Sequence, residues 1–330
     1  MAHSNSSLNT FASCMAKYEH NYIKHTKPCN PPSPHLTFGS MAHEVLYKAG
    51  CLRDEIADGV VDNDAYYPII PSEVLHQDLK STFNISSWQG YFLPIIKQVA
   101  EYEKAIVDEH GNAIVEREIK LQLTSDQLKE LGYYGIKQSL VGVIDLLVYG
   151  KDWAVILDYK FSTGRKGQDE FDMNSQLQLY ALLVHMTYDI PLHNIKVGYI
   201  DIPKQMFGKP IVLSNGTLSR AKSQNVSQDL YKKAVIAIHD DDPYYNCEPG
   251  GYYYDAWCNF ALNKCAYLTL QYLDLDAYQG IVKDVLDAAK MVDYFVEHKL
   301  PFLKKYDSYS CKGCDFIDSC KPWTTVGDFE

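Results

Sequence analysis

The chain has 330 residues, 46% of them hydrophobic, and a formal net charge of −11. This length is enough to bury a substantial core, in one large domain or in two. No apolar run approaches the length of a membrane span, and the polar start from Met1 to Thr10 lacks a signal-peptide pattern. A Gly-x4-Gly-Lys-Ser/Thr motif is also missing, which excludes a P-loop motor within this chain. We therefore expect a cytoplasmic protein from a bacterial, archaeal or phage-infected host cell.

The first fifty residues predict two helices joined by a loop. Residues 8–25 have a helical pattern, and a proline-rich loop follows over residues 27–34. Ser40 is the expected N-cap of a second helix over residues 40–50. That start places His43 in the first turn, where its ring could point toward a site.

An acidic segment and a strand come next. Residues 51–110 carry four Lys or Arg against eleven Asp or Glu, and their mixed periodicity predicts a helical insertion. Residues 113–123 alternate apolar and polar side chains, as a half-buried strand does. We expect this to be the first strand of a sheet.

Two apolar runs, residues 140–150 and 154–161, are separated by a turn-sized break and predict a β-hairpin. They carry Asp145, Asp158 and Lys160. Side chains alternate across a strand, so Asp158 and Lys160 project from the same face. Charged groups in apolar strands are costly to bury unless they are compensated. A divalent cation on the carboxylates would compensate them, and the alternative is a surface salt bridge on an edge hairpin.

The segment after the hairpin predicts an amphipathic helix over residues 174–188. Gln176 and Tyr180 lie four residues apart, which places them on one helical face. The remaining predicted elements are a strand and two helices, over residues 195–202, 226–239 and 276–299.

Together these segments resemble the PD-(D/E)XK nuclease superfamily, in its RecB-like and Cas4-like branch. The resemblance rests on four short motifs in the family's order, Gly39-x3-His43, Gly142-x2-Asp145, Asp158-Tyr159-Lys160 and Gln176-x3-Tyr180. It implies a restriction-endonuclease-like α/β fold, with a mixed central sheet flanked by helices and one nuclease domain over residues 1–330. It also implies a metal-dependent DNA nuclease, of exonuclease type, that acts on single-stranded DNA or DNA ends in recombination, repair or phage and CRISPR DNA processing.

The resemblance also suggests a metal site. Asp145 and Asp158 would supply the oxygen ligands that hard cations prefer, so we expect Mg²⁺ or Mn²⁺. By resemblance His43 is a further ligand, together with the backbone carbonyl of Tyr159. Imidazole in the ligand shell suits Mn²⁺ better than Mg²⁺.

Three side chains are expected to act beside the metal ligands. Lys160 would orient or activate the attacking water, and by resemblance Gln176 and Tyr180 position the water or the scissile phosphate. Glu116 and Glu118, on the preceding strand, are left outside the predicted site.

A second signal lies near the C-terminus, where Cys311, Cys314 and Cys320 leave a four-coordinate site one ligand short. Cys14, in the first predicted helix, is the expected fourth ligand. Spacing alone does not separate an iron–sulfur cluster from structural Zn²⁺. The resemblance favours [4Fe–4S], since RecB-like nucleases with a cluster share this layout. A tail over residues 300–330 would then pack on the Cys14 helix, with the cluster as a staple.

A disulfide framework is a poorer interpretation, because nine cysteines is an odd number and no secretory signal precedes them. The other five cysteines are interpreted as ordinary buried or partly buried thiols: Cys29, Cys51, Cys247, Cys258 and Cys265.

DNA requires positive charge near its phosphates, so the distribution of charge matters more than the net value. Residues 196–233 carry seven Lys or Arg against two Asp or Glu, with Arg220 and Lys222 in a polar stretch suited to phosphate contacts. A solvated loop is the alternative. Arg165 and Lys166, just after the hairpin, are further candidates for DNA binding. The 26 tyrosines could stack on bases, although we expect most to fill cores and interfaces.

A non-catalytic DNA-binding accessory subunit, of a helicase–nuclease or CRISPR adaptation complex, is the alternative to an enzyme. The intact Asp145, Asp158 and Lys160 favour the enzyme, because a purely structural fold has no need of that buried charge. A factor that trims DNA for a partner integrase would share the chemistry. The expected partners are thus DNA and possible helicase, recombinase or integrase subunits.

Overall fold

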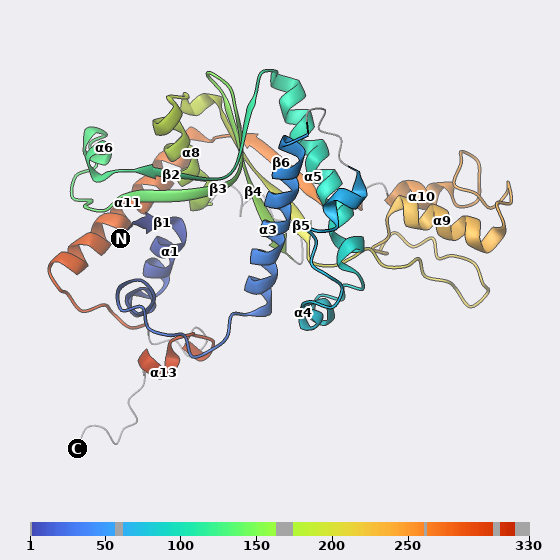
Figure 1. The fold of residues 1–330 in the computed structure, drawn as a ribbon, viewed down its shortest axis with the longest axis horizontal. Helices are drawn as coiled ribbons and strands as arrows, with labels where there is room; N and C mark the ends of the chain where they lie inside the picture. Colours follow the sequence, from blue (N-terminus) through green and yellow to red (C-terminus); the bar gives the residue numbers. More distant parts are fainter. Residues whose placement is uncertain (1, 57–61, 163–173, 261–262, 306–310, 321–330) are drawn as a thin grey trace, which may run out of the picture.

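The computed structural model describes residues 2–56, 62–162, 174–260, 263–305 and 311–320. Within these ranges six strands form one sheet in the order β1-β3-β4-β5-β6, with β2 also paired to β3 (Figure 1). The strands are β1 (His3–Ser4), β2 (Ile114–Leu123), β3 (Leu140–Tyr149), β4 (Ala154–Ser162), β5 (Ile195–Pro203) and β6 (Tyr267–Tyr272). The β1–β3 and β4–β5 pairs are parallel and the others antiparallel. The predicted mixed central sheet is confirmed.

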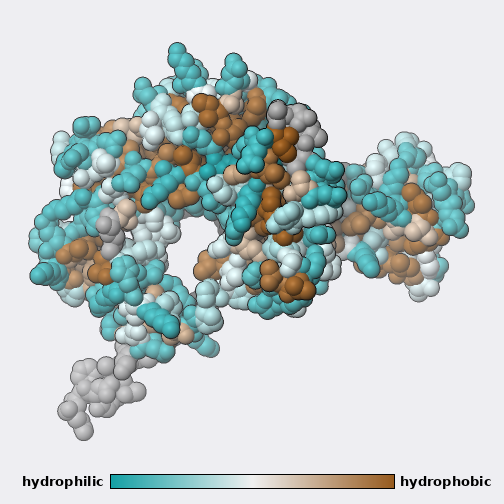
Figure 2. Space-filling view, viewed as in Figure 1, coloured by the Kyte–Doolittle hydropathy of each residue, from teal (hydrophilic) through white to brown (hydrophobic). Residues whose placement is uncertain are grey.

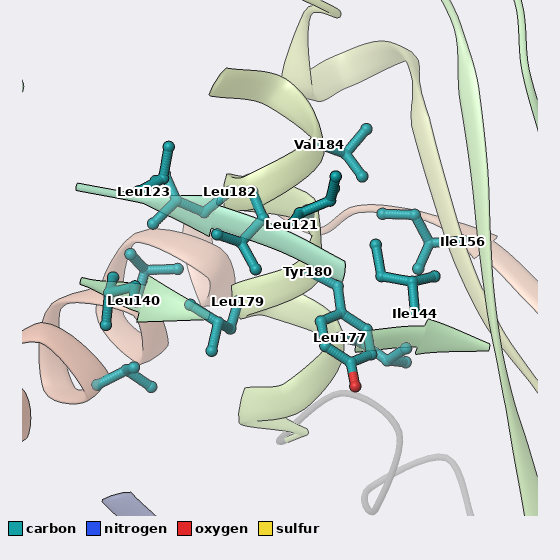
Figure 3. Packing of buried hydrophobic residues seen from close by; sticks show 14 of the residues in the cluster. Leu121, Leu123, Leu140, Ile144, Ile156, Leu177, Leu179, Tyr180, Leu182 and Val184 are labelled. Atoms are coloured by element: carbon teal, nitrogen blue, oxygen red, sulfur yellow. The ribbon is translucent and has the colours of Figure 1, made fainter. Parts of the chain in front are cut away.

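Helices cover both faces of this sheet, because the strands present apolar side chains on both. On β4, Ile156 packs into one core and Leu157 into the other. The first face is covered by α1 (Asn5–Ser13), α6 (Ser125–Glu130), α8 (Ser175–Tyr188) and α11 (Leu275–Glu297). Figure 3 shows this packing, with Leu179 and Tyr180 of α8 lying against Leu140 and Ile144 of β3.

The opposite face is covered by α3 (Pro34–Asp54), α4 (Gln77–Thr82) and α5 (Trp88–His110). The acidic segment over residues 51–110, predicted to be helical, thus contains α4 and α5. Two short 3₁₀ turns, η2 (Asn63–Tyr66) and η3 (Leu192–Asn194), join the larger elements.

A small module over residues 208–260 projects from the sheet (Figure 1). It contains α9 (Gln228–His239) and α10 (Tyr254–Asn259), and it has a hydrophobic core of its own. Tyr231 and Tyr253 are fully buried in that core. These two tyrosines therefore have the structural role that we expected for most of the tyrosines.

Several predicted elements are confirmed with small changes of boundary. The hairpin is β3 and β4, the helix after it is α8 with Asn174 as N-cap, and the later strand and helices are β5, α9 and α11. The prediction that this helix is amphipathic was wrong, because every residue of α8 from Leu177 to Val184 is buried. The strand predicted over residues 113–123 is β2. It is not the first strand of the sheet, as we had expected, because residues 3–4 already pair with β3. Strand β6 was missed by the sequence analysis.

The start of the His43 helix differs from the prediction. Helix α3 begins at Pro34, and the Ser33 side chain accepts a hydrogen bond from the Leu36 amide as N-cap. Pro34 fits the first helical position because its missing N–H needs no partner there. Ser40 is therefore an interior residue of α3, and His43 lies past the first turn.

The N-terminal helix is broken at Cys14, whose backbone is extended (φ −161°, ψ 108°). Helix α1 ends there, and α2 (Met15–Tyr18) and a π-helical turn, η1 (Glu19–Ile23), follow. At the other end of the chain the short helix α13 (Ile317–Cys320) carries the last cysteine. No helix of the described ranges is long and apolar enough to cross a membrane.

Figure 2 shows an opening that passes through the described part of the molecule. In the same view Figure 1 places α1 on one side of this opening and α3 on the other. Both elements also contribute residues to the site described next.

Candidate active site

Two aspartates lie where the β3–β4 ladder ends. The last pair of that ladder is Leu146 with Leu157, and Asp145 and Asp158 are the next residue on each strand. The strands separate at this point, and the Tyr159 amide donates a hydrogen bond to Asp145 Oδ2 (2.7 Å) instead of pairing in the ladder. The separation leaves room for groups from outside the sheet.

Asp158 is the centre of a compact polar cluster, although it is only 3% exposed. Lys160 Nζ lies 2.6 Å from Asp158 Oδ2 as an ion pair, without the geometry of a hydrogen bond. Gln176 Nε2 donates to Asp158 Oδ1 (2.8 Å), while Gln176 Oε1 accepts from Lys160 Nζ (2.9 Å). Gln176 Nε2 also lies 2.7 Å from the Tyr180 hydroxyl. Four of the five predicted catalytic residues, all except Asp145, are therefore joined by direct contacts.

His43 reaches the same point from the opposite helical layer. His43 Nδ1 lies 3.2 Å from Asp145 Oδ1, and its ring packs against Phe161 at a centroid distance of 5.4 Å. Tyr159 has its side chain buried on that side, away from Lys160, as the strand alternation predicts. Helices α3 and α8 thus approach the end of the ladder from the two faces of the sheet.

The electrostatics of the cluster follow from its burial. Burial raises the pKa of Asp158 to about 6, the Asp145 charge adds to this, and Lys160 and His43 oppose it. For His43, burial lowers the pKa, but the hydrogen bond to Asp145 and the charges of both aspartates outweigh it and raise the pKa. Two carboxylates therefore share a site whose compensating charges in this structure are Lys160 and His43.

Glu118 was excluded from the predicted site, but the structure brings it close. It lies on β2 across from Asp145, between the pairs Arg117–Leu146 and Ile119–Ile144. Its φ of 45° is unusual for a strand residue and marks a local distortion of β2. Burial and then the Asp145 charge raise the pKa of Glu118. No sequence pattern indicates this distortion.

Glu116, in contrast, accepts hydrogen bonds from the hydroxyls of Tyr188 (2.7 Å) and Tyr149 (3.4 Å). The Glu116 carboxylate therefore has hydrogen-bond partners that do not belong to the site of Asp145 and Asp158.

Gly142 allows α8 to lie close to β3. A Cβ at this position would stand 2.7 Å from Leu183 Cδ1 and 2.8 Å from Tyr180 Cε1. A cavity of about 220 Å³ adjoins this contact, and Gln176 and Tyr180 line it together with Ser4, Asn5, Ser6 and Val141–Val143. The close packing thus sets where Gln176 and Tyr180 of α8 meet the strands.

The four predicted cluster cysteines line one small pocket. Cys14, Cys311, Cys314 and Cys320 surround it together with His20 and Phe316, and none forms a disulfide. Burial raises the pKa of the Cys320 thiol, and the three other cysteines add to the effect. Across the ranges that the structure describes, no three His, Cys, Asp or Glu side chains are arranged to hold one metal ion as placed.

The C-terminal segment packs against the N-terminal one around this pocket. The Ala16 amide donates to the Leu303 carbonyl (3.1 Å), and His20 stacks on Phe316 at 5.6 Å. Cys29 lies nearby, since its amide donates to the Asp315 carbonyl (2.7 Å).

The structure describes two of the four predicted DNA-binding residues. Arg165 and Lys166 lie outside the described residues. Arg220 and Lys222 belong to the projecting module, where the Arg220 guanidinium lies 4.7 Å from the centroid of the Tyr252 ring.

The family model described as "PD-(D/E)XK nuclease superfamily" matches residues 2–321. No curated protein sequence matches the chain. Among solved structures, a candidate exonuclease from Eubacterium rectale is similar at 9% identity and a TM-score of 0.44, over 98% of this chain and 90% of that one. The protein SSO0001 is similar at 13% identity and a TM-score of 0.27, over 86% of each chain. Both scores lie below 0.5, and neither likeness supports a conclusion about this chain.

Proposed function

Because this chain belongs to the PD-(D/E)XK nuclease superfamily, we propose that it is a metal-dependent DNA nuclease that hydrolyses phosphodiester bonds. The observation that supports this most is the contact set of Asp158, which is 3% exposed and lies against Lys160 and Gln176. Burying such a group is costly, and a purely structural fold gains little from it. A site that binds a cation and a phosphate accounts for it.

The donor set fits Mg²⁺ or Mn²⁺, since two carboxylates meet where the ladder ends and, among the described residues, His43 and Lys160 are the cations that contact them. Asp145, Asp158 and His43 are the proposed ligands, with the Tyr159 carbonyl. A bound cation would polarise the phosphate and lower the pKa of the attacking water.

The remaining residues position the reacting groups. Lys160 is held by Gln176 Oε1 (2.9 Å), so its ammonium has a fixed direction in which to orient water or the phosphate. The Tyr180 hydroxyl accepts a hydrogen bond from Gln176 Nε2 (2.7 Å), and both side chains line the cavity beside β3. These three side chains form one hydrogen-bonded unit, which favours preorganisation of the site.

The test is cleavage of end-labelled DNA in Mg²⁺ or Mn²⁺. Asp158→Asn replaces an anionic ligand by a neutral amide and should abolish cleavage. Lys160→Met should also lose cleavage but should keep the binding of Mn²⁺, because lysine is not a ligand. Full cleavage by Asp158→Asn, in a preparation free of contaminating nuclease, would exclude the catalytic role. Binding of DNA without cleavage by the wild-type protein would favour the accessory subunit instead.

We further infer that the substrate is a single strand with a free end. The supporting observation is the opening between α1 and α3, both of which contribute to the site or its adjoining cavity (Figures 1 and 2). A strand that enters by threading needs an end, so linear single strands should be degraded and circular ones of the same sequence should not. Equal degradation of both would identify an endonuclease.

We also propose that Cys14, Cys311, Cys314 and Cys320 hold a [4Fe–4S] cluster. Four thiols from the two ends of the chain line one pocket, and four thiolates are the usual ligand set of such a cluster. The cluster would staple the C-terminal segment to the N-terminal helices.

A further inference from the structure

Lys204 is a buried cation that the proposed chemistry does not use. It directly follows β5, its amide donates to the Ser162 carbonyl (2.9 Å), and the residue is 9% exposed. Its Nζ lies 5.6 Å from the centroid of the Phe83 ring and 6.0 Å from that of Phe38. Its closest polar contact is His35 Nδ1, at 3.3 Å. Among the described residues, no carboxylate forms an ion pair with this ammonium.

Within the described ranges this arrangement lacks an anion. Burial lowers the pKa of Lys204, and no negative charge of those ranges offsets the effect. An ammonium has three donors, of which His35 Nδ1 can accept one, and an imidazole that accepts at Nδ1 carries a donor at Nε2. The pair therefore offers donors and positive charge to a ligand, at a position where His35 is exposed. A phosphate group has the matching chemistry.

The surface between this pair and the active site is open. His35, Gly39 and His43 recur every four residues along α3, so they lie on one face of that helix. A Cβ at Gly39 would meet no atom within 4 Å. Eight residues of helix span about 12 Å, which is three to four nucleotides of a stacked strand at about 3.4 Å each.

We propose that Lys204 and His35 bind a backbone phosphate of the substrate strand, a few nucleotides from the phosphate that is cleaved, with the strand running past Gly39. This inference rests on the proposed nuclease function, and it adds a direction along α3 in which the strand lies. The contact is with the backbone, so it carries no sequence preference.

The first test compares Lys204→Met with Lys283→Met, a matched loss of charge on the exposed face of α11, where Lys283 pairs with Asp287. Binding of a labelled single strand is measured in EDTA at several salt concentrations. Each phosphate contact contributes about 0.7 to the slope of log K against log[salt]. The slope should fall by about that amount for Lys204→Met and stay unchanged for Lys283→Met. A wild-type slope in a folded Lys204→Met protein overturns the proposal.

Thermal stability separates binding from folding in this experiment. Methionine keeps the packing against Phe38 and Phe83 and removes a costly buried charge, so the melting temperature should stay equal or rise. A lower melting temperature with unchanged affinity would assign Lys204 a structural role instead.

A second test locates the phosphate. In strands that carry one uncharged methylphosphonate at successive positions, wild-type affinity should drop at one position a few nucleotides from the cleaved bond. Lys204→Met should be insensitive at that position, whereas a subsite for free phosphate or product would give no position dependence and would overturn the proposal. Normal cleavage with no Lys204 effect rejects only this inference, and wild-type protein that neither binds nor cleaves DNA rejects both.

A third test concerns the path along α3. Gly39→Gln places a side chain on the face of α3 between His35 and His43, while Ser40→Gln places the same side chain at the neighbouring exposed position. Helix α3 should tolerate both substitutions, since glutamine is a better helix former than glycine or serine. Gly39→Gln alone should raise KM for the single strand. Equal KM values for the two variants would exclude this path.

Discussion

At the scale of single residues, the burial of Asp158 is expected to lower the stability of the folded protein. The Asp158 pKa of about 6 in the fold exceeds the ordinary value of 3.8, so between these values the folded state binds more protons than the unfolded state. The stability of the metal-free protein should therefore fall as pH rises from about 4 to about 6, and the cost is fully present above that range. Two pKa units correspond to a cost on the order of 2–3 kcal/mol.

Asp158→Asn should remove this cost. In EDTA, its melting temperature should exceed that of the wild type by several degrees at pH 7.5 and should match it near pH 4, where the wild-type carboxyl is protonated. Asp152→Asn, in the exposed turn of the hairpin, controls for the loss of one surface charge. A difference that is the same at both pH values would contradict a burial effect at Asp158.

At the scale of elements, the contact of α8 with β3 determines where Gln176 and Tyr180 lie. Gly142→Ala would place a Cβ 2.7–2.9 Å from Leu183 and Tyr180 atoms, so α8 must shift or these two side chains must move. Overpacking of this kind costs about 1–3 kcal/mol, and a displacement of about 1 Å at the site can lower the rate about a hundredfold.

The control is Gly280→Ala within α11, where a Cβ meets no atom within 4 Å. That variant should gain about 0.5–1 kcal/mol from helix propensity and keep wild-type activity. Melting curves and kcat for both variants provide the check. A Gly142→Ala protein with unchanged melting temperature and kcat would show that the helix has room to move.

The elements that could be predicted from the sequence are those with strong periodicity. The hairpin of β3 and β4 was recognisable from two apolar runs, and α8 from its helical pattern. These two elements carry most of the predicted site, including Asp145, Asp158 and Gln176. The faces on which these charged side chains lie could thus be predicted, because they depend only on the alternation of side chains along each strand.

What could not be predicted depends on contacts between distant segments. The two-residue strand β1 exists because residues 3–4 pair with β3, and no local propensity indicates so short a strand. Glu118 comes close to Asp145 because β2 is distorted at one residue, and the Lys204–His35 contact joins positions 169 residues apart. Ser33 was missed as the N-cap because Ser40 offered the same local chemistry closer to the apolar pattern.

At the scale of the whole molecule, the cysteine pocket joins the two ends of the chain. Cys14 lies at the break between α1 and α2, while the other three cysteines of the pocket follow α11. A bond through metal would close a loop of nearly the whole sequence, which removes much entropy from the unfolded state. Since α1 also borders the opening beside the site, the staple would hold one wall of that opening in place.

Metal analysis would distinguish the two proposed occupants of this pocket, [4Fe–4S] and Zn²⁺. With [4Fe–4S], anaerobically purified protein should be brown, with broad absorption near 400 nm (roughly the thiolate-to-iron region) and about four irons per chain. With Zn²⁺ it should be colourless and contain about one zinc, because a d¹⁰ ion lacks such transitions.

Cys314→Ser should lose the metal and lower the melting temperature, whereas Cys258→Ser, which changes an exposed cysteine of α10, should change neither. A colourless preparation with stoichiometric zinc would overturn the [4Fe–4S] assignment, but a metal would still link the two ends of the chain. An unchanged melting temperature in metal-free Cys314→Ser would contradict the staple, and the catalytic assignment of Asp145 and Asp158 depends on neither result.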